Sequence, residues 1–227
     1  MTKFRKIKRF ILDILYPNRC PLCERIIRYD ELVCDDCKKA IKSTDDFCKL
    51  CGLKKCDCNN KKYYDLALSV GVYEGRLRSA LLRLKTLRND ELSEFFAQSI
   101  SEKLGDTKLD AVVFVPMTKQ RKRKSGFNQS YHLAKALSNE LNLPLIKNAL
   151  VKVKDYKHHE LTGVQRVLEV KGAYIKGNAE IRNKKVALVD DIVTTGSTMN
   201  ECARLLKEMG AKSVTALFVA KTADDFV

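Results

Sequence analysis

The sequence predicts an α/β protein with a mostly parallel sheet flanked by helices, and with a small cysteine-rich module at the N-terminus. Two observations predict this fold class. Short apolar, β-rich runs alternate with segments in which apolar residues recur at helical spacing, an order typical of parallel sheets. Eight of the nine cysteines lie between residues 20 and 58, ahead of these alternating elements. The chain has 227 residues, 45% of them hydrophobic, which is enough to bury a core without disulfides.

The first 18 residues form a segment of their own. Apolar residues recur there at helical spacing, and five cations lie between them: Lys3, Arg5, Lys6, Lys8 and Arg9. This pattern predicts a basic amphipathic helix over residues 1–18. Two interpretations stay open: its apolar face packs on the next module, or the helix contacts a membrane or nucleic acid.

The cysteines of residues 19–60 have the spacing of metal ligands. They are Cys20, Cys23, Cys34, Cys37, Cys48, Cys51, Cys56 and Cys58. Two C-x-x-C knuckles complete a tetrahedral Zn²⁺ site, so the first four predict a structural zinc ribbon and the last four a second site. One or two zinc ions are expected, and cross-braced pairing stays open. Disulfides are disfavoured in a reducing compartment. Apolar residues around Tyr29-Asp30 predict a hairpin arm.

Residues 61–227 form the predicted α/β domain. Strands are expected at 66–73, 111–115, 186–189 and 214–220, and helices at 76–87, 91–104 and 126–141. A last helix follows residue 197, with Thr198 and Glu201 at capping-box spacing and Gly210 as its C-terminal stop. Cys202 lies on its apolar face, which predicts a core position.

A strongly basic run follows the strand at 111–115. Five of the six residues from Lys119 to Lys124 are cationic. Ligand sites gather at the carboxyl ends of parallel strands. The run is therefore either a solvated surface loop or a pyrophosphate clamp, and the clamp interpretation assigns Lys119, Arg121 and Arg123 to the ligand.

The stretch from Val186 to Thr198, VALVDDIVTTGST, carries the clearest chemical signal. A buried strand ends in Asp190 and Asp191, and a hydroxyl-rich turn then opens a helix. Free amides at a helix start suit a phosphate, and two carboxylates suit hydroxyl donors or a hydrated Mg²⁺. Together these features describe a ribose 5-phosphate that also carries a pyrophosphate.

This stretch resembles the phosphoribosyl pyrophosphate (PRPP) binding motif of type I phosphoribosyltransferases. The resemblance implies that Asp190 and Asp191 are the catalytic acid pair and bind the ribose hydroxyls. It assigns the 5′-phosphate to the turn residues Thr194, Thr195, Gly196, Ser197 and Thr198. It also implies a type I phosphoribosyltransferase-like parallel sheet flanked by helices. The chain has neither a G-x-x-x-x-G-K-[ST] loop nor a G-x-G-x-x-G fingerprint.

The order of parts is similar to that of the ComF-type competence protein family, which includes the GntX-like proteins. The shared parts are the cysteine array, Tyr73-Glu74-Gly75, Leu84-Lys85, Gly126-Phe127-Asn128-Gln129 and the PRPP motif. Many relatives carry Arg where this chain has Ser125. The lid of the family corresponds to residues 157–166, which include His158 and His159.

The resemblance implies a PRPP-binding protein acting in competence and DNA uptake, with Mg²⁺-dependent transfer of phosphoribose to an unidentified acceptor. Six-oxopurine enzymes carry an acid where this chain has Thr194, which disfavours hypoxanthine and guanine as acceptors. Two non-catalytic alternatives stay open: a competence factor that binds single-stranded DNA, and a PRPP sensor.

Charge and hydropathy suggest the partners. Forty-three Lys and Arg against 28 acids give a net charge of +15. This excess favours polyanions, so PRPP, single-stranded DNA and DNA-uptake proteins are the expected partners. No transmembrane run or secretory segment is predicted, so a cytoplasmic protein is expected, with peripheral membrane contact left open. Monomer and homodimer both remain open.

Overall fold

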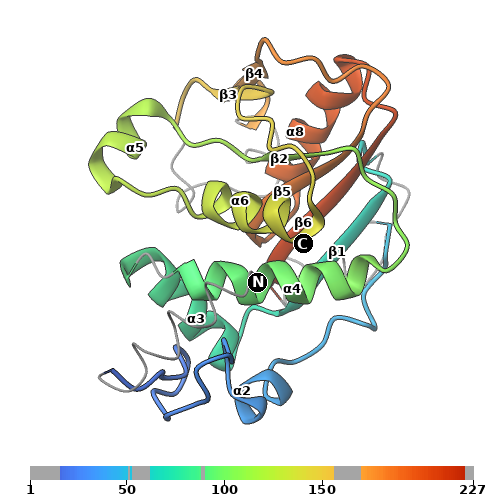
Figure 1. Ribbon diagram of the computed structural model, residues 1–227. Coiled ribbons are helices and arrows are strands. Elements are labelled where there is room, and N and C mark those ends of the chain that lie inside the picture. Colours follow the sequence, from blue (N-terminus) through green and yellow to red (C-terminus); the bar gives the residue numbers. More distant parts are fainter. Residues whose placement is uncertain (1–15, 51, 53–61, 88–89, 156–169, 223–227) are drawn as a thin grey trace.

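The computed structural model describes residues 16–50, 52, 62–87, 90–155 and 170–222. At its centre lies a four-stranded sheet in the order β1-β6-β5-β2, with every neighbouring pair parallel (Figure 1). Its strands are β1 (Leu66–Val72), β6 (Ser213–Lys221), β5 (Lys185–Val193) and β2 (Ala111–Phe114). The parallel sheet predicted from the sequence is confirmed, and the carboxyl ends of its strands meet at one edge.

Helices cover both faces of this sheet. One apolar cluster joins it to α3 (Gly75–Leu87), α4 (Asp90–Leu104) and α6 (Gln129–Leu141), and the other joins it to α8 (Ser197–Glu208). On β5, Ala187 and Val189 belong to the first cluster, whereas Val186 and Leu188 belong to the second. A strand buried on both faces is apolar at consecutive positions, which explains its unbroken apolar run.

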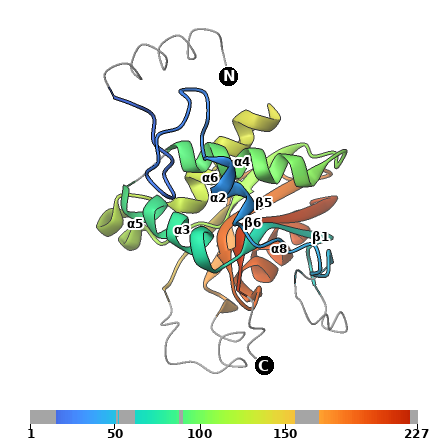
Figure 2. The same cartoon turned by 90° about the horizontal axis from the view of Figure 1, so that it is seen from below.

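The cysteine-rich module packs beside α3, and its one described helix is α2 (Asp35–Lys39) (Figures 1 and 2). Cys20, Val33 and Cys37 share an apolar cluster with Leu77 and Leu84 of α3. The module and the α/β domain therefore bury a common core.

The hairpin arm expected at Tyr29-Asp30 is not formed. Within the described part of the module, the β contact is an isolated antiparallel bridge between Arg19 and Ile26. The knuckle between these residues is closed by the Cys20 amide, which donates to the Arg25 carbonyl at 2.8 Å.

The basic run is a short helix, α5 (Lys119–Ser125), rather than a loop. Thr118 Oγ1 caps it by accepting a hydrogen bond from the Arg121 amide at 3.2 Å. Gly126 ends it with a φ of 65°, a left-handed conformation that glycine adopts without strain.

Two predicted helix starts are also corrected. The helix expected from residue 126 begins at Gln129, because Gly126 is left-handed and Asn128 caps α6. The final helix, α8, begins at Ser197 after Gly196, and no capping box forms there. Its predicted end is confirmed, because Gly210 has a φ of 89° and its amide donates to Lys207 at 2.9 Å.

A second, two-stranded antiparallel sheet was not predicted. It pairs β3 (Leu150–Lys152) with β4 (Tyr174–Lys176), and three residues per strand are too few to leave a periodic signal. Four predicted features lie wholly or mostly outside the described residues. They are the helix predicted over residues 1–18, of which only 16–18 are described and are not helical, the cysteines 51, 56 and 58, the His158-His159 pair, and the lid at 157–166.

Candidate functional site

The acid pair lies within strand β5, close to its carboxyl end. Asp190 is 9% exposed, and Ser130 Oγ of α6 donates a hydrogen bond of 2.7 Å to its Oδ1. The same oxygen accepts the Asp191 amide at 3.0 Å, and Asp191 Oδ1 accepts the Ile192 amide at 2.9 Å. The two carboxylates are thus held in fixed orientations by the strand and by α6.

Burial and mutual repulsion govern the charge of this pair. Loss of hydration raises the pKa of Asp190 well above its ordinary value, and the charge of Asp191 raises it further. Burial also raises the pKa of Asp191, against which the positive charge of Arg121 acts. Two close carboxylates of this kind are poised to take a cation or hydroxyl donors, either of which relieves the repulsion.

The turn after the acid pair has the geometry of an anion-binding loop. Gly196 has a φ of 77°, so a side chain there would be strained. Thr195 Oγ1 and Ser197 Oγ lie 2.9 Å apart, and the Asn200 amide donates to the Gly196 carbonyl at 2.8 Å as α8 begins. A glycine-containing turn with hydroxyls at a helix start is a common arrangement for binding a phosphate.

A cleft of about 550 Å³ brings the acid pair and the turn together. Asp190, Asp191 and all five residues from Thr194 to Thr198 line it. The cleft also has walls outside the predicted site residues: Tyr73, Leu81, Leu82 and Lys85 near α3, Gln129 and Ser130 at α6, and Lys152 and Tyr174 on the β3–β4 pair. Tyr73, Lys85 and Gln129 belong to motifs that the sequence shares with ComF-type proteins, although those motifs did not assign them to the ligand site. The others belong to no such motif, and separate elements bring them to the cleft.

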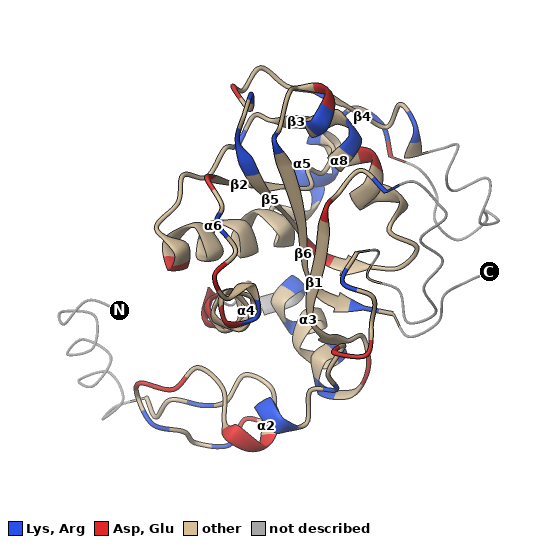
Figure 3. Cartoon of the chain, turned by 90° about the vertical axis from the view of Figure 1, so that its right-hand side faces the viewer, with Lys and Arg blue, Asp and Glu red and all other residues tan. Residues whose placement is uncertain are grey.

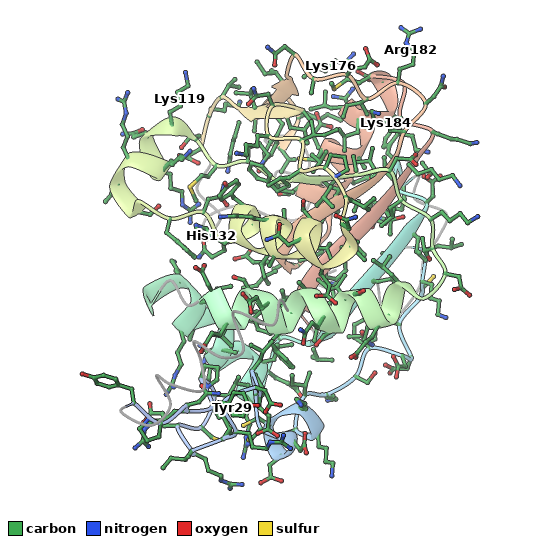
Figure 4. All side chains as sticks on the ribbon, in the orientation of Figure 1. Tyr29, Lys119, His132, Lys176, Arg182 and Lys184 are labelled. Carbon is green, nitrogen blue, oxygen red and sulfur yellow. The ribbon has the colours of Figure 1, made fainter. Side chains whose placement is uncertain are left out.

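The cations of α5 do not all reach this cleft. Arg121 lines it, whereas Lys119 and Arg123 are exposed and are not among its lining residues. Figure 4 shows Lys119 directed away from the molecule. Lys and Arg occur along α5 and on both strands of the β3–β4 pair (Figure 3).

His132 and Cys202 have structural surroundings. The His132 ring stacks on Phe127 with centroids 4.2 Å apart, and its Nδ1 lies 3.5 Å from Asp90 Oδ1 (Figure 4). Cys202 is fully buried in the α8 core, as predicted.

Cys20, Cys23, Cys34 and Cys37 form a compact cluster in which all four Sγ atoms lie within 4.8 Å of one another. The Cys20–Cys37 and Cys23–Cys34 sulfurs are each 3.7 Å apart. Four thiolates about 2.3 Å from a tetrahedral Zn²⁺ are separated by about 3.8 Å, so this arrangement fits zinc. Cys48 lies apart from this cluster, and its three expected partners are outside the described residues.

Two arginines of α3 join this cluster to the α/β domain. Arg76 Nη1 donates to Cys37 Sγ at 2.8 Å. Arg83 donates to the Pro21 carbonyl and to Glu24 Oε1, each at 2.9 Å. An arginine beside a thiolate cluster offsets its negative charge, so Arg76 is placed to support a metal ion held by these cysteines.

The family model for the phosphoribosyl transferase domain matches residues 93–225, more than half of the chain, and includes the acid pair and the turn. This chain belongs to the phosphoribosyl transferase domain family. The double zinc ribbon domain model matches residues 11–64, which supports zinc at the cysteine cluster.

Curated relatives confirm the resemblance to ComF-type proteins. The chain is 28% identical to Competence protein F of Haemophilus influenzae over 207 residues, covering 83% of this chain and 90% of that protein. It is 27% identical to Competence protein ComFC of Bacillus subtilis over 210 residues, 85% of each chain. It is also 27% identical to the DNA utilization protein YhgH of Escherichia coli over 223 residues, 91% and 98% of the two chains.

Solved structures of phosphoribosyltransferases are similar to this chain at lower sequence identity. Purine phosphoribosyltransferase from Pyrococcus horikoshii is 20% identical, with a TM-score of 0.38 over 61% of this chain and 85% of that one. Adenine phosphoribosyltransferase from Saccharomyces cerevisiae is 17% identical, with a TM-score of 0.40 over 60% of this chain and 71% of that one.

Among the described residues, no helix is long and apolar enough to span a membrane.

Proposed function

We propose that this protein binds PRPP with Mg²⁺ and transfers its phosphoribosyl group to an acceptor during competence and DNA uptake. One observation carries the proposal. The buried acid pair, oriented by Ser130 and by backbone amides, shares a cleft with a hydroxyl-rich turn at the start of α8. Carboxylates suit the ribose hydroxyls of such a ligand, and the turn suits its 5′-phosphate. The names of the relatives support the setting in DNA uptake.

The residues at the cleft fit Mg²⁺ as well. Asp191 is partly exposed to the cleft, so it is open to a hydrated cation, and Mg²⁺ takes one or two carboxylates together with substrate phosphates. When bound, the ion neutralises charge on the leaving pyrophosphate. Asp190 and Asp191 would hold the ribose, and Arg121, which lines the same cleft, would face the pyrophosphate. Catalysis then consists of positioning and charge stabilisation.

Calorimetry with PRPP and Mg²⁺ tests this proposal. We expect the wild type to bind PRPP and to bind it more weakly without Mg²⁺. Changing both Asp190→Asn and Asp191→Asn should abolish Mg²⁺-dependent binding, because neutral amides do not attract the cation. Asp110→Asn, a change outside the cleft at the opposite end of the sheet, is the matched control and should bind normally. A wild type without PRPP affinity, or a double variant with full affinity, refutes the proposal.

A second candidate is supported by helix α5. Its five cations are exposed, and most of them lie outside the cleft, a pattern that suits the phosphates of single-stranded DNA. This function needs no turnover. Consumption of PRPP by the purified protein, tested against a panel of acceptors, separates the enzyme from a DNA-binding factor or a PRPP sensor that binds PRPP without consuming it.

A further inference from the structure

Lys221 is a buried lysine behind the turn that follows the acid pair. It is the last residue of β6, only 1% exposed, and lies between Val72 of β1 and Val193 of β5 in the sheet. Its Nζ donates a hydrogen bond to the Thr194 carbonyl and lies 3.5 Å from the Thr222 carbonyl. The ammonium thus sits beneath the first residue of the turn.

Burying a lysine side chain in this way costs free energy. An ammonium loses its hydration in a protein interior, and lysines are almost never fully buried without polar partners. A methionine or leucine would fill the same space without that cost. The cost of burying this lysine is therefore offset by its hydrogen bonds or by an interaction of its charge.

The hydrogen bond to Thr194 fixes the orientation of one peptide unit. The C=O and N–H groups of a planar trans peptide point in opposite directions. Because the Thr194 carbonyl is turned toward Lys221, the Thr195 amide of the same unit is turned away from the buried amine. It is thereby available to the cleft, which Thr194 and Thr195 both line.

The positive charge of Lys221 is a second reason to assign this residue a role at the turn. The turn residues Thr194 to Thr198 contain no cation, and Arg121, Lys85 and Lys152 line the cleft from other elements. Lys221 therefore supplies positive charge directly behind the turn, where a bound phosphate would profit from it. Charge effects of this kind are strong where water is excluded.

We propose that Lys221 is a positioning residue for a sugar phosphate. It holds the Thr194–Thr195 peptide so that the Thr195 amide donates a hydrogen bond to a 5′-phosphate bound at the turn. This inference rests on the proposed function and names the part of the ligand that Lys221 supports. It assigns no contact between Lys221 and the ligand. The residue acts through the turn.

Three ligands test the proposal by calorimetry in the presence of Mg²⁺: PRPP, ribose 5-phosphate and inorganic pyrophosphate. Lys221→Met keeps an unbranched side chain, one atom shorter, and removes the charge and the donor. We expect this variant to bind PRPP and ribose 5-phosphate at least tenfold more weakly than the wild type does. Its affinity for pyrophosphate should stay within twofold of the wild-type value. Lys212→Met, an exposed lysine just before the other end of β6, controls for the loss of one charge and should match the wild type for all three ligands.

Lys221→Gln covers the case in which the methionine variant does not fold. It keeps a donor for the Thr194 carbonyl but not the charge, so we expect an intermediate loss for the two sugar phosphates. Equal affinity for ribose 5-phosphate in wild type and folded variants overturns the inference, and so does an equal loss for all three ligands. A wild type that binds neither PRPP nor ribose 5-phosphate refutes the proposed function itself.

Discussion

At the scale of single residues, the acid pair carries a conflict between stability and binding. Asp190 is almost completely buried beside a second carboxylate, and its pKa is raised by burial and by the charge of Asp191. A site that binds a cation has to keep such charges close together before the cation arrives. The folded protein therefore stores repulsion that the ligand is expected to relieve.

The raised pKa predicts how stability depends on pH. An aspartate with a folded pKa above its unfolded value binds more protons when folded, so its stabilisation is present at acidic pH. That stabilisation is lost as pH rises from about 4 through the raised folded pKa. At pH 7, Asp190→Asn should therefore raise the free energy of unfolding by about 0.5–2 kcal/mol, as stabilising changes at functional sites often do.

Urea unfolding of the wild type and of Asp190→Asn, measured at pH 5 and pH 8, checks this prediction. We expect the advantage of the variant to grow with pH, while its PRPP binding is lost at both. An advantage that shrinks toward pH 8 would contradict the raised pKa.

Ser130 gives a second prediction for a single residue. Its hydroxyl donates to Asp190 Oδ1 at 2.7 Å and so favours the charged carboxylate. Ser130→Ala should raise the pKa of Asp190 further and weaken Mg²⁺-dependent PRPP binding about tenfold at pH 7, since hydrogen bonds to charged groups contribute about 1.5–3 kcal/mol.

The affinity lost in Ser130→Ala should be partly regained at higher pH, as Asp190 becomes ionised. Ser138→Ala is the matched control, because Ser138 lies on the same helix and bonds the Leu143 carbonyl at 2.5 Å instead. Equal affinities of the two variants at pH 7 would rule out the role given to Ser130.

At the scale of elements, helix α5 divides its cations between two surroundings. Arg121 lines the cleft, and its charge opposes the rise in the pKa of Asp191 that burial causes. Lys119, Lys122 and Lys124 are exposed outside the cleft. A regular helix cannot turn every residue to one side, so the basic run is unable to clamp a ligand as a whole.

This division predicts separate effects on PRPP and on DNA. Arg121→Ala should lower the affinity for PRPP and barely change the affinity for single-stranded DNA. Changing Lys119, Lys122 and Lys124 together to Ala should spare PRPP and lower the salt dependence of single-stranded DNA binding, by about 0.7 in log–log slope per lost phosphate contact. Calorimetry and fluorescence anisotropy at several salt concentrations measure both. If the triple variant keeps the full slope, α5 is a solvated surface.

At the scale of the whole molecule, the cysteine module and the cleft share helix α3. Cys20 and Cys37 lie in one apolar cluster with Leu77 and Leu84, while Leu82 and Lys85 of the same helix line the cleft. Arg76 of this helix donates a hydrogen bond to Cys37 Sγ. The metal centre therefore supports a wall of the cleft as well as its own module.

Removal of zinc tests this connection. Metal analysis should find one or two zinc ions per chain, and chelation should lower the melting temperature and weaken PRPP binding together, because the binding energy of structural zinc is folding energy. Arg76→Gln should lose zinc to a chelator faster than Arg78→Gln, an exposed neighbour on the same helix. Less than about one zinc per chain, or unchanged PRPP affinity after complete zinc removal, would contradict the connection.

The sequence alone determined the features that depend on local pattern. Apolar runs predicted the four parallel strands, C-x-x-C spacing predicted the Cys20–Cys37 cluster, and the stretch from Val186 to Thr198 predicted an acid pair ahead of a phosphate-type turn. Local spacing suffices for these, because strand burial, metal knuckles and turns each need only a few neighbouring residues.

Only the tertiary structure decided which distant residues join them. Ser130 reaches Asp190 across 60 positions of sequence, and Arg76 reaches Cys37 across 39. Lys221 lies behind Thr194 because β6, the last strand in the chain, is inserted between β1 and β5. Strand order is set by the packing of the whole core, and no local periodicity records it.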